Sequence, residues 1–176
     1  MSGQHGVQAR AAQRRPATPA EVRVLASAVR LRIIRLTYGR ALTNKEIAER
    51  LDKDPATTLY HVRKLVGAGF LEALPERSGS RGAREIPYLS TGLSWRLNHA
   101  GKEASIVQAM LEAFLGEVAD TGVGNLRSSR LVMQLDEDGV AELQARVDDV
   151  LREFAAREPV PGGRRTAIYV ALYPSE

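Results

Sequence analysis

The sequence predicts an α+β protein in which short helices lead into a two-stranded hairpin, and a strand–helix–strand segment follows near the C-terminus. Two observations carry this prediction. Between Thr43 and Gly67, apolar residues recur at helical spacing on both sides of a polar break. After Gly69 the apolar pattern changes to the short alternation of strands, and it does so again in the final part of the chain.

The composition indicates a soluble, cytoplasmic protein. Hydrophobic residues make up 44% of the 176 residues, which is enough for a packed core. Because there is no cysteine, disulfides and thiolate metal sites are excluded. No apolar run approaches the roughly 20 residues of a membrane span, and the first residues lack the apolar middle of a secretory signal. We therefore expect no membrane partner.

The charge is divided unevenly along the chain, although the net value is only +4. Residues 1–20 hold three Arg and no acid; residues 21–92 hold 13 Lys and Arg against 8 Asp and Glu, a balance of +5. Residues 93–176 hold 9 against 13, a balance of −4. This division favours a polyanionic partner for the first half of the chain only.

Residues 1–18 are predicted to be a flexible basic arm, because they are rich in Ala, Gln, Arg and Gly and include a proline. The simpler interpretation is a disordered tail. The alternative is that Arg10, Arg14 and Arg15 contact DNA phosphates or a minor groove.

Two helices are expected next. Apolar residues from about Pro19 predict a short first helix, and residues 28–38 predict a strongly amphipathic second one that ends at Gly39. Arg30, Arg32 and Arg35 lie among its apolar positions. We interpret these arginines as a solvated face, from which one can reach a phosphate.

A polar turn separates the two helices of the central stretch. Thr43 followed by Glu46 is a capping box, which predicts a helix start, and the pattern breaks at residues 51–54. Asp54 is a favourable N-cap, and Pro55 suits the first position of a second helix. Gly67 or Gly69 can end that helix.

The second helix of this stretch has the composition of a helix that enters a DNA major groove. Its apolar positions Leu59, Val62 and Val66 are expected to point inward. The remaining positions carry hydroxyl, aromatic-polar and basic groups, and contain no acid. Such groups read base edges and hold phosphates.

A basic hairpin is predicted directly after this helix. Residues 70–74 and 85–90 are candidate strands, and a Gly/Ser/Arg loop joins them. Arg77, Arg81 and Arg84 would lie at or near the tip, where they can follow the phosphate backbone or enter a minor groove. Pro87 suggests that the second strand is an edge strand. The alternative is a surface hairpin that happens to be basic.

These segments together resemble the winged helix-turn-helix domain of ArsR-like bacterial transcriptional regulators. The matching segments are LASAVRLRII at 25–34, LTNKEIA at 42–48, TTLYHVRKL at 57–65, AGFL at 68–71, and Tyr88. The resemblance covers a little over a third of the chain and implies a two-fold dimer on promoter DNA. It implies base contacts by Thr57, Thr58, Tyr60, His61 and Lys64, and phosphate contacts by Arg63 and the wing arginines Arg77, Arg81 and Arg84.

The chain departs from the metal-sensing members of that family. Those members use cysteines near the recognition region or His and carboxylate sets on a C-terminal helix. Here cysteine is absent, and the histidines are His5, His61 and His99. A lone histidine is a weak metal site, so we predict a DNA or packing contact for His61 and no metal or other cofactor.

Residues 93–176 are expected to hold a dimerisation helix and a small appendage. Residues 102–118 carry a broad apolar stripe, which is compatible with core, a dimer seam or one wall of a ligand pocket. Trp95 is expected to anchor this helix to the winged domain. Residues 130–135 and 166–173 are predicted strands on either side of a helix capped by Asp136.

The predicted organisation is therefore a 1–18 arm, a 19–92 winged helix-turn-helix domain, and a 93–176 dimerisation and possible effector region. Catalysis is not predicted, because residues 136–138 are acids where helix-capping acids belong and no phosphate-binding loop follows a strand. The leading hypothesis is a homodimeric repressor that binds double-stranded operator DNA. The alternatives are a winged-helix module that binds a protein, and a regulator whose C-terminal half senses a small molecule.

Overall fold

The computed structural model of the chain describes residues 14–79, 84–98, 103–158, 160 and 162–175. It divides into two compact units, whose described residues fall within 13–125 and within 126–176; we call these the N-terminal unit and the C-terminal unit. The boundary that the sequence suggested at residue 92 therefore lies at residue 125. The reason is that the long helix after residue 103 packs into the first unit.

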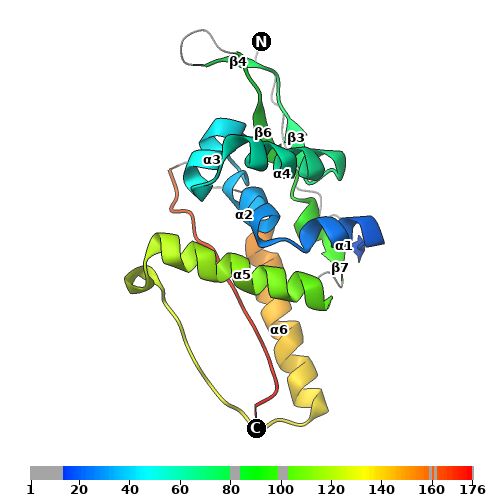
Figure 1. The fold of residues 1–176 in the computed structure, drawn as a ribbon. Helices are drawn as coiled ribbons and strands as arrows, with labels where there is room; N and C mark the ends of the chain where they lie inside the picture. The colour runs from blue at the N-terminus through cyan, green and yellow to red at the C-terminus, as the bar shows by residue number, and fades with distance from the viewer. Residues whose placement is uncertain (1–13, 80–83, 99–102, 159, 161, 176) are drawn as a thin grey trace, which may run out of the picture. The chain divides into compact units, whose positions relative to one another are not determined.

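Four helices form the first part of the N-terminal unit: α1 (Pro19–Leu25), α2 (Ala28–Leu36), α3 (Asn44–Leu51) and α4 (Pro55–Gly67) (Figure 1). Their starts follow local chemistry. Thr18 and Glu21 form a capping box at α1, and Thr43 and Glu46 form another at α3. The helices that the sequence predicts here are confirmed.

A three-stranded antiparallel sheet joins the helices to the wing. Its strands are β2 (Leu42–Thr43), β6 (Pro87–Ser90) and β3 (Leu71–Ala73), in the order β2-β6-β3. The prediction that Pro87 marks an edge strand is wrong, because β6 is the central strand. Pro87 is tolerated there because it is the first residue of the strand, where it pairs with Thr43.

The wing is an extension of this sheet. Beyond β3 and β6, strand β4 (Arg77–Ser78) pairs antiparallel with β5 (Arg84–Glu85). Figure 1 shows this hairpin projecting away from α3 and α4. The predicted two-stranded wing is therefore present, and it begins directly after the second helix of the helix-turn-helix.

Part of the predicted flexible arm is held against the N-terminal unit. Strand β1 (Arg15–Pro16) pairs in parallel with β7 (Leu97–Asn98), which follows the 3₁₀ helix η2 (Leu93–Arg96). Arg15 also donates two hydrogen bonds to the buried Glu21 carboxylate, at 2.5 and 2.9 Å. The prediction of a flexible arm therefore fails for residues 14–18, and residues 1–13, including Arg10, lie outside the described residues.

Helix α5 (Ala104–Thr121) packs on α2 and is followed by the 3₁₀ helix η4 (Val123–Asn125). It turns Ile106, Ala109 and Ala113 into the core. Two ion pairs add to this contact, Arg32 with Asp120 and Arg35 with Glu117. Arg32 and Arg35 thus hold α5, while Arg30 donates to the carbonyls of Val24 and Arg23 in α1, which corrects the interpretation of these arginines as a solvated face.

The predicted role of Trp95 as an anchor for α5 stays a prediction. Trp95 lies in η2, its ring is 44% exposed, and the Arg14 guanidinium carbon stands 4.4 Å from the ring centroid. Its contact is therefore a cation–π contact with the N-terminal segment.

One hydrophobic core lies within the N-terminal unit. Its fully buried members come from α2, β2, α3, α4, β3, α5 and the turn before β3: Ile33, Leu42, Ile47, Val62, Leu65, Phe70, Leu71 and Ile106. Every helix from α1 to α5 therefore has at least one side turned to the same interior.

The C-terminal unit has a different character. Helix α6 (Glu137–Ala155) begins at Asp136, whose carboxylate accepts from the Gly139 amide at 2.8 Å. Among the described residues of 126–176, the predicted strands at 130–135 and 166–173 are not formed, and no residue is buried. The alternation is present, but a strand also needs a neighbour to complete its hydrogen bonds.

Candidate nucleic-acid interface

The turn between α3 and α4 fixes the direction in which α4 leaves. Asp52 adopts the left-handed conformation, with φ 50°, and ends α3. Two residues later the Asp54 carboxylate accepts from the amides of Ala56 and Thr57, both at 2.9 Å. Because these amides hydrogen-bond to the carboxylate, the pKa of Asp54 is lowered and it remains ionised at the positive end of the α4 dipole.

A second link ties the starts of the two helices together. The Asn44 side-chain amide, at the first position of α3, donates to the carbonyl of Pro55, at the first position of α4, at 2.9 Å. Sequence periodicity contains no signal for this contact, because it joins residues that are 11 positions apart. The angle between α3 and α4 therefore depends on specific side chains.

Helix α4 is buried along Thr58, Val62 and Leu65. Leu59 and Val66 are only half-buried, so the inward face is rotated by about one residue from the predicted one. The rotation corrects one predicted base contact. Thr58 is 0% exposed and its hydroxyl donates to the Asp54 carbonyl at 2.9 Å, so it is not available to DNA.

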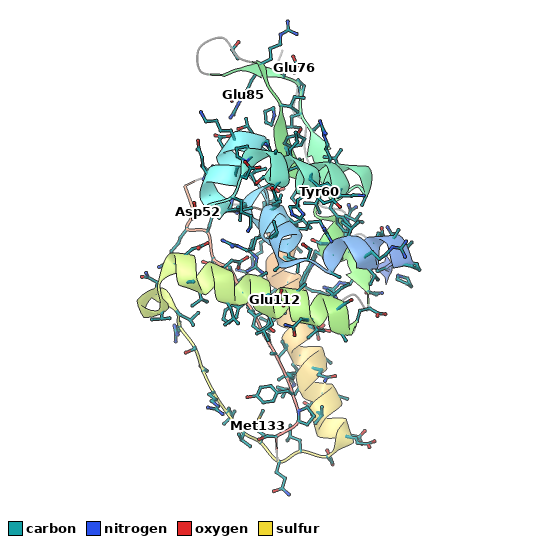
Figure 2. The ribbon with its side chains drawn as sticks, viewed as in Figure 1. Asp52, Tyr60, Glu76, Glu85, Glu112 and Met133 are labelled. Carbon is teal, nitrogen blue, oxygen red and sulfur yellow. The ribbon has the colours of Figure 1, made fainter. Side chains whose placement is uncertain are left out.

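The exposed side of α4 gathers the other predicted residues. Thr57, Tyr60, Arg63 and Lys64 are all exposed, and Tyr60 is labelled in Figure 2. The Lys64 ammonium lies 5.6 Å from the centroid of the Tyr60 ring, which keeps these two side chains on one patch of the helix. This patch holds a hydroxyl, a phenol and two cations.

His61 lies at the edge of this patch and is half-buried. Its ring meets the Tyr60 ring edge to face, with centroids 5.4 Å apart, and its Nδ1 is buried without a hydrogen-bond partner among the described residues. Burial lowers the pKa of His61, and the nearby charges of Arg30 and Lys53 lower it further. His61 is therefore neutral at pH 7 and can offer one donor and one acceptor.

The wing arginines have different surroundings. Arg77 donates to the Glu46 carboxylate of α3 at 2.9 Å, and Arg84 pairs with Glu76 at 3.3 Å while its side chain stays 85% exposed. Arg81 lies outside the described residues. Glu46 is also the capping-box acid of α3, so the Arg77 pair joins the wing to the start of that helix.

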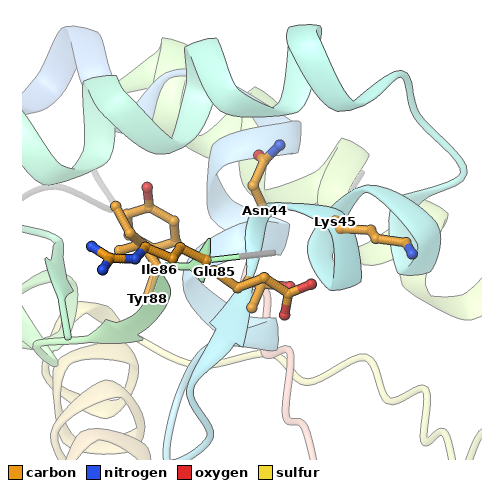
Figure 3. A pocket seen from close by; sticks show the side chains of 7 residues that line it. Asn44, Lys45, Glu85, Ile86 and Tyr88 are labelled. Carbon is orange, nitrogen blue, oxygen red and sulfur yellow. The ribbon is translucent and has the colours of Figure 1, made fainter. Parts of the chain in front are cut away.

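An open hollow of about 300 Å³ separates the start of α3 from the wing. Residues 43–45 form one side, and residues 84–86 with Tyr88 form the other. Figure 3 shows Asn44 and Lys45 on the side of α3, facing Glu85, Ile86 and Tyr88. The cations Lys45 and Arg84 therefore stand at its two sides.

Other features of the described residues bear on function. No helix is long and apolar enough to cross a membrane, and no group of three or more His and acidic residues is placed to hold a metal ion. The acids at 136–138 stand at the first turn of α6, where Asp136 is the cap, as the sequence predicted. The balance of charge in residues 13–125 is +5, from 17 Lys and Arg against 12 Asp and Glu.

Comparison with known proteins agrees with this description. Residues 25–72 match the family model of a helix-turn-helix domain. This segment runs from the end of α1 into β3 and contains the whole of α2, α3 and α4. A search of curated proteins finds no match. The fold, the site and the family match define a DNA-binding transcriptional regulator of the winged helix-turn-helix class.

Similar solved structures include reduced HlyU from Vibrio cholerae, at 18% identity and a TM-score of 0.35, covering 55% of this chain and 84% of that one. A mutant of Lactococcus lactis ZitR in apo form has 17% identity and a TM-score of 0.33, and covers 73% of this chain and 83% of that one. A mutant of Escherichia coli MarR complexed with operator DNA has 23% identity and a TM-score of 0.28, covering 77% of this chain and 76% of that one.

Proposed function

We propose that this protein is a homodimeric, cytoplasmic repressor that inserts α4 into the major groove of operator DNA and lays the wing beside it. The exposed patch of α4 carries the proposal. It presents hydroxyl, phenol and cationic groups, no acid lies between residues 55 and 67, and a capped turn fixes its direction. The sequence resemblance to ArsR-like regulators supports the same role.

In this proposal the residues of α4 fall into two groups, those that contact base edges and those that contact phosphates. Thr57, Tyr60, His61 and Lys64 approach base edges, because they share the exposed side or its rim. Arg63 is exposed and contacts a phosphate. Thr58 has no part in this set, since it is buried.

The wing arginines have two tasks. Arg84, with most of its side chain in solvent, contacts the backbone or the minor groove, and we assign the same contact to Arg81. Arg77 instead positions the wing through its ion pair with Glu46. Losing that pair would release the wing from α3, so we expect an indirect effect on affinity.

The apolar outer side of α5 supports a dimer. Val107, Met110, Leu111 and Leu115 are between 39% and 57% exposed, and their spacing places them on one stripe of the helix. A two-fold contact through this stripe would cover it. Paired α4 helices on one face of DNA would then read half-sites about 34 Å apart. Occupancy of such a site within a promoter excludes polymerase.

The test begins with selection of bound duplexes from a random DNA pool, followed by fluorescence anisotropy on the selected site. Lys64→Ala should weaken binding and reduce the log–log salt slope by about 0.9, the value for one lost phosphate contact, if Lys64 lies on the backbone. If it reads a base, the loss is about 1–3 kcal/mol and is confined to sites carrying that base.

Arg146→Ala is the matched control, because it removes the same charge from the exposed surface of α6. Equal affinity of the wild-type protein, Lys64→Ala and Arg146→Ala for the selected site would contradict the assignment of α4. A failure to retain any duplex at low salt would contradict DNA binding itself and favour a winged-helix module that binds a protein.

A further inference from the structure

The C-terminal unit exposes far more apolar surface than a free unit of its size should. Thirteen of its large hydrophobic side chains are at least 42% exposed, among them Leu131, Phe154 and Tyr173. Half-exposed side chains of this size leave on the order of 50 to 100 Å² each. Their sum is similar to the roughly 800 Å² that one partner buries in a standard interface.

The sequence of the two segments that flank α6 alternates as in a strand that has one apolar face. In the segment 130–135, Leu131, Met133 and Leu135 alternate with Arg130, Val132 and Gln134. In the segment 166–173, Ile168, Val170 and Leu172 alternate with residues on the other side. Each extended segment therefore has three apolar side chains on one face.

Helix α6 carries the complementary stripe. Val140, Leu143, Val147, Val150 and Phe154 follow each other at steps of three and four, yet Val140, Val150 and Phe154 are 42%, 54% and 55% exposed. Leu143 and Val147 are half-buried, so the stripe is formed but only partly covered. Figure 1 shows that both extended segments run in the same direction and opposite to α6, which is the chain path of a strand–helix–strand unit.

The described residues of one copy do not complete this unit. Its two segments form no strand among them, although two strands become stable once a helix such as α6 packs on them or further strands extend the sheet. A second copy supplies two further strands and a second apolar helix. Charge does not oppose the contact: residues 126–176 hold seven Arg against nine Asp and Glu, a balance of only −2.

We propose that the C-terminal unit is one half of a shared domain, in which two copies of this chain combine segments 130–135 and 166–173 into one four-stranded sheet covered by both α6 helices. This interface is additional to the α5 stripe and does not depend on DNA binding. In this arrangement the strands that the sequence predicts form only when two copies associate.

The experiment measures mass by light scattering on the full chain carrying Leu115→Asp, which places a charge in the α5 stripe. This variant should keep the dimer mass of 38.4 kDa, twice the 19.2 kDa of one chain. Adding Val170→Asp should weaken the dimer at least about 100-fold, because it buries a charge within the shared sheet. Adding Ala171→Asp should not, because position 171 lies on the opposite face of the same segment.

Three results would overturn the proposal: a monomeric Leu115→Asp variant at concentrations where the wild-type chain is a dimer, equal dimer stability with Val170→Asp and Ala171→Asp, or a wild-type chain that is monomeric. The first two leave the α5 dimer and DNA binding intact, so they are distinguishable from a failure of the proposed function.

Hydrogen exchange provides a second measurement, which does not depend on whether the Val170→Asp variant folds. In Leu115→Asp, amide protection in 166–173 should follow the dimer fraction on dilution, while protection in α4 stays constant. Protection of 166–173 that is equal in monomer and dimer would show that the segment is covered within one chain, and would contradict the shared sheet.

Discussion

The two units of this chain have equally clear sequence patterns but very different environments. In the N-terminal unit, residues such as Ile33, Ile47 and Val62 are 0% exposed, and their helices share one core. In the C-terminal unit, α6 is as amphipathic as α3, yet it contains no buried residue. Periodicity therefore predicts the element and its apolar side, and it does not tell whether the same chain covers that side.

The largest expected effect comes from replacing one phenylalanine by alanine in each unit and comparing the losses of unfolding free energy. Phe70 is 1% exposed and Phe154 is 55% exposed. Phe70→Ala should cost about 3–5 kcal/mol of unfolding free energy, through lost transfer energy and a cavity. Phe154→Ala should change the same transition by less than about 0.5 kcal/mol.

Both values can be read from urea unfolding followed by fluorescence of Trp95, the single tryptophan, which lies in the N-terminal unit. Similar losses of unfolding free energy in the two variants would mean that the two units unfold in one transition. They would contradict the difference in packing between the units.

A second test concerns the buried acid of the N-terminal unit. The hydrogen bonds from Arg15, with those of Thr18, lower the pKa of Glu21 to about 2, against a usual value of 4.5. Arg15→Ala leaves this buried carboxylate with the Thr18 amide but without its cationic partner, so we expect a loss of about 1–3 kcal/mol at pH 7. Arg23→Ala, an exposed arginine on the same helix, is the control and should cost less than about 0.5 kcal/mol.

The pH dependence follows from the sign of the shift. Because the pKa of Glu21 is lower in the folded protein, its stabilisation is complete above pH 4.5 and is lost as the pH falls toward about 2. Arg15→Ala should therefore lose less stability than the wild-type chain over this interval. Parallel stability curves for the two proteins would contradict the assigned role of the pair.

The sequence predicts most of the N-terminal unit because its signals are local. The capping box of Thr43 and Glu46, the Asp54 cap and the basic hairpin each depend on residues a few positions apart. The pairing of β1 with β7 and the ion pairs between α2 and α5 were not predicted, since they join distant residues whose contact has no periodic signature. The predicted C-terminal strands have the alternation of strands in the sequence, but no strand is formed there among the described residues.

The candidate interface shows the same limit in finer detail. The composition of α4 predicts a helix with an exposed polar and cationic side, and the structure has one. It does not tell which of the adjacent residues Thr58 and Leu59 is turned fully inward. That rotation is set by packing of Val62 and Leu65 against the rest of the core. Likewise, Arg77 has the same local sequence signal as Arg84, and only the fold reveals that Glu46 holds it.

The smallest expected effects compare one ion pair from each unit. Arg32, 17% exposed, pairs with Asp120 across the α2–α5 contact, whereas Arg146, 77% exposed, pairs with Glu142 one turn away on α6. Arg32→Ala removes a partly buried partner and alkyl packing, so we expect about 1–2 kcal/mol. Arg146→Ala should cost at most about 0.5 kcal/mol, because solvent and salt screen an exposed pair.

Hydrogen exchange in α5 and α6 separates these outcomes from a general loss of charge. Arg32→Ala should raise exchange along α5, since the helix loses a tether, and raising the salt concentration should not reproduce that change. Arg146→Ala should alter α6 no more than added salt does. If both substitutions act equally, the Arg32–Asp120 pair contributes no more to the α2–α5 contact than the Arg146–Glu142 pair contributes on the open surface of α6.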